Sequence, residues 1–177
     1  MPRMKSEIVG TTVEYATGDK LGKVRDILVD TTGAKWPVVG LVVGSQASTR
    51  EHLLTPSAKV SVVEKAGKRR VVVTGHAEMK PITHRASSRD RMRLSHLDRA
   101  DVKGDDDKSV GRLYDVVLRL STDPWRVDRL LVRPKGVKGR RLRVAPQHVA
   151  AVRRKEVVLS MSAEEAQEKA GHTAAAA

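Results

Sequence analysis

Apolar and polar residues alternate with a period of two along several segments of the chain, which is typical of a β-strand with one face in a core. Segment 24–30 alternates in this way, and segment 113–120 places Tyr114 and Val116 on one face. Segment 8–15 is a further, shorter strand candidate. Turn residues separate these segments, and no long amphipathic helix interrupts them. The pattern predicts an all-β fold.

A valine-rich strand is expected at 36–43, and it is apolar on both faces. A strand of this kind usually has a packed neighbour on each side of its sheet. One face is expected to meet the core. We expect the other face, which carries Val38, Gly40 and Val42, to form an interface with a partner or with a second copy of the chain.

The strands fall into two copies of one unit. Residues 22–43 recur at 111–132 with a constant offset of 89 and no gap. Positions that recur unchanged include Gly22, Asp26 and Trp36 in the first copy, which match Gly111, Asp115 and Trp125 in the second. Such a repeat indicates a duplicated structural unit. We expect the tryptophans to pack in a core or between the units, and the aspartates to cap neighbouring loops, with a binding role left open for both pairs.

The repeat predicts two small β-barrels in tandem, followed by a short C-terminal helix. The expected parts are a first barrel, a connector, a second barrel, and a helix with a frayed tail, at residues 1–77, 78–93, 94–160 and 161–177. Ser162 and Glu165 have the spacing of a capping box that starts the helix, and Gly171 is placed to end it. Because each barrel is small, we expect the two to pack together.

The chain is strongly basic, with 34 Lys and Arg against 21 Asp and Glu and a net charge of +13. An excess of this size favours anionic partners, and RNA or the ribosome, an anionic membrane surface and an acidic protein all remain open. Basic residues that serve only solubility are the alternative. The absence of cysteine excludes disulfides and thiolate chemistry, and neither a signal peptide nor an apolar run of membrane-spanning length is recognisable. A cytoplasmic protein is expected.

Side chains suited to catalysis or metal binding show no recognisable spacing. The six histidines lack the close pairing of a metal motif, and no serine lies in a nucleophile elbow. The run Asp105-Asp106-Asp107 lacks the spaced ligands of a calcium loop and is expected to be a hairpin tip. We therefore expect no enzyme activity, no metal and no cofactor.

The densest group of basic residues lies in the second copy. The candidate partner-binding or anion-binding residues are Arg133, Lys135, Lys138, Arg140, Arg141, Arg143, Arg153, Arg154 and Lys155. We expect them at neighbouring strand ends, where they would contact phosphates or acidic groups. The chain contains two tryptophans, two tyrosines and no phenylalanine, which disfavours stacking on single-stranded bases. Duplex or ribosomal RNA recognised by its backbone remains open.

The segment Gly22-Lys23-Val24-Arg25-Asp26-Ile27-Leu28-Val29-Asp30 resembles the signature hairpin of the PRC-barrel family, and residues 111–118 are similar. The family includes the cytoplasmic domain of the photosynthetic reaction centre H subunit, the C-terminal barrel of the ribosome maturation factor RimM and small archaeal cell-division adaptors. Segment 125–133 and its basic turn look most like the second barrel of tandem pairs that precede magnesium-transporter-type N-terminal domains.

The resemblance implies a module that binds other macromolecules, usually proteins, and it brings no shared catalytic residue. The expected function is therefore a non-enzymatic adaptor or scaffold that binds a protein partner, with the cytoplasmic membrane face as one setting. A factor that binds RNA or the ribosome through its basic surface is the alternative, and self-association remains open.

Overall fold

The computed structural model describes residues 2–44, 50–57, 59–75, 79–82, 91–135, 141–153 and 155–174, the last six as backbone only. The fold is all-β, as predicted, with two sheets and one short α-helix. The α-helix is α1 (Ala163–Ala174), and the short 3-10 helices include η1 (Lys5–Glu7), η3 (Leu94–Leu97) and η4 (Pro146–His148). Within the described ranges, no helix combines the length and the apolar character needed to cross a lipid bilayer.

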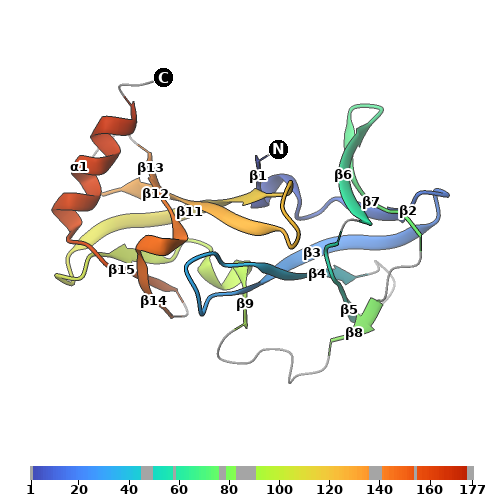
Figure 1. Cartoon of the computed structure of the whole chain (residues 1–177), viewed down its shortest axis with the longest axis horizontal. Helices are drawn as coiled ribbons and strands as arrows, with labels where there is room; N and C mark the ends of the chain where they lie inside the picture. Colours follow the sequence, from blue (N-terminus) through green and yellow to red (C-terminus); the bar gives the residue numbers. More distant parts are fainter. Residues whose placement is uncertain are drawn as a thin grey trace.

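The first sheet comes mainly from the first half of the chain. Its strands are β2 (Thr12–Tyr15), β3 (Lys20–Asp30), β4 (Val38–Gly44), β5 (Glu51–Leu54), β6 (Val60–Lys65), β7 (Lys68–Val73) and β8 (Met79–Pro81). They follow the order β6-β7-β2-β3-β4-β5-β8. The long hairpin β3–β4 forms the middle of this sheet (Figure 1).

The second sheet comes mainly from the second half. Its strands are β10 (Asp101–Lys103), β11 (Ser109–Arg119), β12 (Arg126–Pro134), β13 (Leu142–Val144), β14 (Val149–Arg153) and β15 (Glu156–Leu159). They follow the order β13-β12-β11-β10-β15-β14. This is the order β5-β4-β3-β2-β7-β6 of the first sheet, and in both sheets the first strand of the unit pairs in parallel with the last. The sequence repeat therefore corresponds to a repeat of topology.

Each sheet also receives one short strand from the other half of the chain. Strand β1 (Pro2–Met4) pairs with β11 of the second sheet, and β9 (Arg91–Arg93) pairs with β3 of the first. In Figure 1, β1 lies beside β11, and β9 lies below β3 and β4. The two strands are related by the same offset of 89 residues as the repeat. The halves are thus interlocked, and the expectation that the two units pack together is met by an exchange of strands.

The carboxylates of the recurring aspartates fix this exchange. Asp26 accepts hydrogen bonds from the backbone N–H of Ser95 at 3.2 Å and from its hydroxyl. Asp115 accepts the same two bonds from Ser6, with a backbone distance of 3.3 Å. Ser6 and Ser95 lie in η1 and η3, the 3-10 helices that directly follow the exchanged strands. Each aspartate therefore anchors the segment that arrives from the opposite half.

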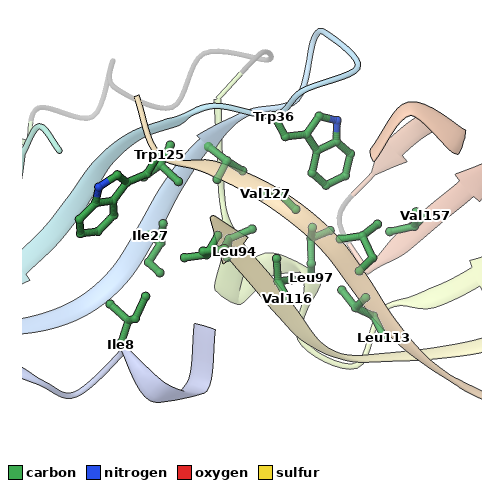
Figure 2. Close-up of a cluster of buried hydrophobic side chains, with 14 of the residues drawn as sticks. Ile8, Ile27, Trp36, Leu94, Leu97, Leu113, Val116, Trp125, Val127 and Val157 are labelled. Atoms are coloured by element: carbon green, nitrogen blue, oxygen red, sulfur yellow. The ribbon is translucent and has the colours of Figure 1, made fainter. Parts of the chain in front are cut away.

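The hairpin loops β3–β4 and β11–β12 also contact each other. The amide of Val38 donates to the carbonyl of Trp125 at 2.7 Å, and the amide of Val127 donates to the carbonyl of Trp36 at 3.0 Å. Both indoles are almost fully buried, in one hydrophobic cluster drawn from both halves. Figure 2 shows Trp125 on the side of Ile27 and Ile8, and Trp36 on the opposite side, towards Val157. Each tryptophan thus lies towards core residues of the other half.

Three local predictions are wrong. Ile8 lies in a turn between η1 and β2, where its side chain is fully buried, and not in a strand. Trp36 precedes β4 in a loop, with a positive φ of 40°. Helix α1 begins with the predicted capping box, in which the amide of Glu165 donates to Ser162 Oγ at 3.2 Å, but it runs past Gly171 to Ala174. A glycine costs a helix only about 1 kcal/mol, so it does not by itself end one.

The face of β4 that was expected to meet a partner is also not available. Val38 and Val42 are 2% and 0% exposed, and Gly40 is buried. The side chain of Leu53 on β5 covers Gly40, because a Cβ built there would lie 2.3 Å from Leu53 Cδ1. This surface is closed within the chain itself.

The hairpin tip at Asp106 holds the start of α1, and this contact is expected to weaken in acid. Burial opposes ionisation of the carboxylate, but hydrogen bonds from the amides of Lys108 and Ala163 prevail and lower the pKa of Asp106 below 3.8. A lowered folded-state pKa gives stability that is complete above the unfolded value and lost as the pH falls through the folded value. We expect the protection of amides at the N-terminus of α1, relative to their intrinsic exchange rates at the same pH, to fall below about pH 4. The variant Asp106→Ala should show the lower protection already at pH 7, and identical exchange in both proteins would contradict this role.

Candidate anion-binding surface

Tyr114 lies at an irregularity of β11, and two arginines are held against its ring. The register of β11 with β12 shifts between Leu113 and Asp115, so Tyr114 has no partner on β12. The guanidinium carbons of Arg133 and Arg141 lie 5.7 Å and 5.6 Å from the centre of the Tyr114 ring. At this distance the ring attracts both cations. Arg133 and Arg141 are therefore positioned side chains although both are exposed.

A groove of about 600 Å³ opens beside this group. Its lining includes Tyr114 and the cationic residues Arg99, Arg112, Arg133 and Lys135. Among the described residues of the lining, Asp101 is the only acidic one, and its carboxylate pairs with Arg112 at 3.2 Å. Among the described residues, no ion pair involves Arg99, Arg133, Lys135 or Arg141. The groove has a surplus of positive charge.

Further arginines extend this charge along the outer face of the second sheet. Arg129, Leu131 and Arg133 are spaced by two residues and so share one face of β12. Leu131 pairs with Arg143 on β13. Arg112 on β11 pairs with Arg133. We call this group the Tyr114 surface, and its members are Arg112, Tyr114, Arg129, Arg133, Arg141 and Arg143. All five arginines are exposed.

The corresponding face of the first sheet carries different chemistry. The repeat aligns Arg129 with Gly40 and Arg133 with Gly44. Leu131 in the second copy corresponds to Val42 in the first. Because Leu131 pairs with Arg143 and Val42 pairs with Leu53, Arg143 corresponds to Leu53, and two residues earlier Arg141 corresponds to Glu51. In the first sheet Glu51 is paired with Arg93 at 2.5 Å, and this bond raises the pKa of Arg93. Because the same topology forms without these four cations, the fold does not require them. The position of Arg112 carries a cation in both copies, since Lys23 stands there in the first.

The first half has a groove of its own, of about 520 Å³, but its two arginines are held in ion pairs. Arg69 pairs with Glu7 at 2.8 Å. Arg70, its neighbour in the lining, pairs with Glu14 at 2.7 Å. An anion would have to compete with these carboxylates, so the groove of the second half is the better candidate for an anion.

The basic residues proposed from the sequence divide into separate groups. Arg133, Lys135, Arg141 and Arg143 lie on or beside the Tyr114 surface. Arg153 and Lys155 are on the β14–β15 hairpin, at the other end of the strand order, and not on a neighbouring strand. Arg153 pairs with Glu156 at 3.4 Å, and Lys155 donates to the carbonyl of Asp98 at 3.0 Å. Lys138, Arg140 and Arg154 lie outside the described residues.

Sequence reasoning missed four members of the groove and of the surface. Arg112 and Tyr114 reach the basic run only through the pairing of β11 with β12, and Arg99 reaches the groove from a turn, whereas Arg129 lies on β12 four residues before Arg133. One signal was present, since Arg129 stands where the first copy has Gly40. Comparing the two copies position by position would have singled out this face.

The family comparison identifies the first unit. A model of the PRC-barrel domain matches residues 4–80, which contain η1 and the strands β2 to β7. A PRC-barrel domain is thus found in the first half of the chain. A search of curated protein sequences found no match.

Proposed function

We propose that this chain is a non-enzymatic adaptor that binds a protein partner through the Tyr114 surface, with residues 94–160 forming a second PRC-type barrel. The PRC-barrel domain at 4–80 and the repeated strand order support this assignment. In this proposal the protein acts in the cytoplasm, where the cytoplasmic face of a membrane is one setting for the complex.

One observation carries the proposal. Five exposed arginines lie on one continuous sheet face, and at four of these positions, all except that of Arg112, the first unit has no cation. Two of them are held against Tyr114, so part of the entropy cost of ordering their long side chains on binding is already met. Electrostatic complementarity across such a face gives specificity and rapid association with an acidic surface.

Removal of two of these charges is expected to abolish capture of the partner. The variant Arg129→Ala/Arg133→Ala should retain at most about a tenth of the captured protein when the tagged chain is incubated with native lysate at low salt. The matched control is Lys65→Ala/Lys68→Ala, which removes the same charge from exposed positions on the β6–β7 hairpin. Equal capture by both variants would contradict the proposal, as would the absence of any captured protein.

A second candidate is a factor that binds RNA or the ribosome, and the net charge of +13 favours it. Contacts to several phosphates would make the affinity fall steeply with salt concentration. If nuclease treatment of the lysate removes the captured material, RNA is the partner. If the captured protein survives nuclease, the adaptor assignment stands.

A further inference from the structure

The edge of the second sheet at β13 differs from the equivalent edge of the first sheet. In the first sheet β5 is covered by β8, with Leu54, Leu53 and His52 opposite Met79, Lys80 and Pro81. In the second sheet β13, the counterpart of β5, is the end strand of the described part of the sheet. The described residues after β15 lead into α1, and none of them pairs with β13 as β8 pairs with β5. Within the described part of the chain, the second sheet thus has no counterpart of β8.

The pairing of β8 with β5 shows which side chains a strand needs in order to pair with the edge of such a sheet. The half-buried Met79 packs against the hydrophobic core next to Leu54, and the exposed Lys80 lies opposite Leu53 on the outer face. The amide of Ile82 donates to the carbonyl of Glu51 at 3.1 Å, so the backbone groups of Glu51 and, by alternation, Leu53 point to the added strand. The shared register places the backbone of Arg143 in the same orientation at the edge of β13.

The two faces of β13 define the side chains that an added strand must carry. Leu142 and Val144 are buried in the same cluster as Ala163 and Ala166 of α1, so apolar residues suit that side. Arg141 and Arg143 are exposed on the other side, and neither has an acidic partner among the described residues. Opposite charges on directly paired residues stabilise a sheet, and like charges destabilise it. The arginines therefore disfavour pairing between the β13 strands of two copies and favour an acidic strand.

We infer that β13 binds an extended acidic segment of a protein partner as an added antiparallel strand, in the place that β8 occupies on β5. Acidic residues two positions apart lie opposite Arg143 and Arg141, the residue between them lies beside Leu142, and the residue next to the one opposite Arg143 lies beside Val144. Backbone hydrogen bonds supply affinity, and the alternating side chains supply specificity. The inference rests on the proposed function, because it specifies which part of the partner reaches the Tyr114 surface.

Binding of a labelled peptide to the full-length chain tests the inference. The probe is a fluorescent octapeptide of alternating glutamate and valine, followed by fluorescence anisotropy. We expect the variant Arg141→Ala/Arg143→Ala to bind it at least about tenfold more weakly than the parent. The control Lys65→Ala/Lys68→Ala should stay within about twofold, because these lysines lie on the other sheet.

Two further arms separate strand addition from simple charge attraction. A peptide with proline at a central glutamate position, and one glutamate added at its end to keep the charge equal, lacks a backbone N–H that would face β13. It should bind about tenfold more weakly than the alternating peptide. The amide of Arg143 should become protected from hydrogen exchange when the alternating peptide binds. Equal binding of both peptides, unchanged exchange at Arg143, or displacement of the peptide by an equimolar single-stranded RNA octamer would each overturn the inference.

Capture of a protein from lysate distinguishes failure of the added-strand inference from failure of the proposed function. If Arg141→Ala/Arg143→Ala captures the lysate protein as well as the parent does, the added strand is wrong while the adaptor assignment survives. If neither protein captures a partner, the adaptor assignment itself fails. Loss of capture by this variant together with loss of peptide binding supports both.

Discussion

The variant Trp125→Ala is expected to lower the free energy of unfolding of the whole chain by about 3–5 kcal/mol. Trp125 is 3% exposed, and its indole lies towards Ile27 and Ile8 of the first half (Figure 2). The loss therefore leaves a cavity in a core that both halves share. Urea denaturation followed by far-UV circular dichroism measures it. Trp125→Phe retains most of the buried area and should cost clearly less.

Two single-tryptophan proteins test whether the halves unfold as one unit. Trp36→Phe leaves Trp125 as the fluorescent reporter, and Trp125→Phe leaves Trp36. Because both indoles belong to one hydrophobic cluster, we expect fluorescence and circular dichroism to give the same denaturation midpoint within each variant. Separate transitions for the two reporters would contradict a common core.

The variant Gly111→Ala is expected to destabilise the second sheet by about 1–3 kcal/mol. A Cβ at this position would lie 2.2 Å from the carbonyl oxygen of Arg133 and 2.8 Å from Pro134 Cα. These are backbone atoms of the paired strand β12, so they cannot turn away as a flexible side chain would. The matched substitution Gly22→Ala should cost less, because its nearest contact, the carbonyl oxygen of Gly44, is 2.8 Å away.

Urea denaturation of both glycine variants measures this difference. Equal stability of Gly111→Ala and the parent would contradict this prediction, because it would mean that the backbone of β12 can shift at this point with no loss of free energy of unfolding.

The sequence predicted the parts of the fold that depend on local patterns. Alternation of apolar residues located the long hairpins, and the spacing of Ser162 and Glu165 located the start of α1. The exchange of β1 and β9 could not be predicted, because three-residue strands have no periodicity of their own. Their placement depends on contacts such as Ser95 with Asp26, which are 69 residues apart.

The candidate site was predicted only in part for the same reason. Arg133, Lys135, Arg141 and Arg143 stood out as a basic run in sequence, whereas Arg112 and Tyr114 approach them only through the pairing of β11 with β12. The apolar face of β4 was misjudged because its cover, Leu53, lies on the next strand. Hydrophobicity alone does not distinguish a face that is buried by the same chain from one that waits for a partner.

The exchange of β1 and β9 between the two halves also determines the order in which strand pairs can form while the protein is synthesised. The first sheet gains β9 only after Arg93 has left the ribosome, and β1, although made first, has no strand to pair with until β11 is complete at Arg119. The first sheet therefore emerges with part of β3 still unpaired, at a stage when most of the second half of the chain has not been synthesised. The nascent chain therefore completes its native strand pairing late. Until β9 and β11 have been synthesised, its unpaired strand edges are exposed to non-native pairing and aggregation.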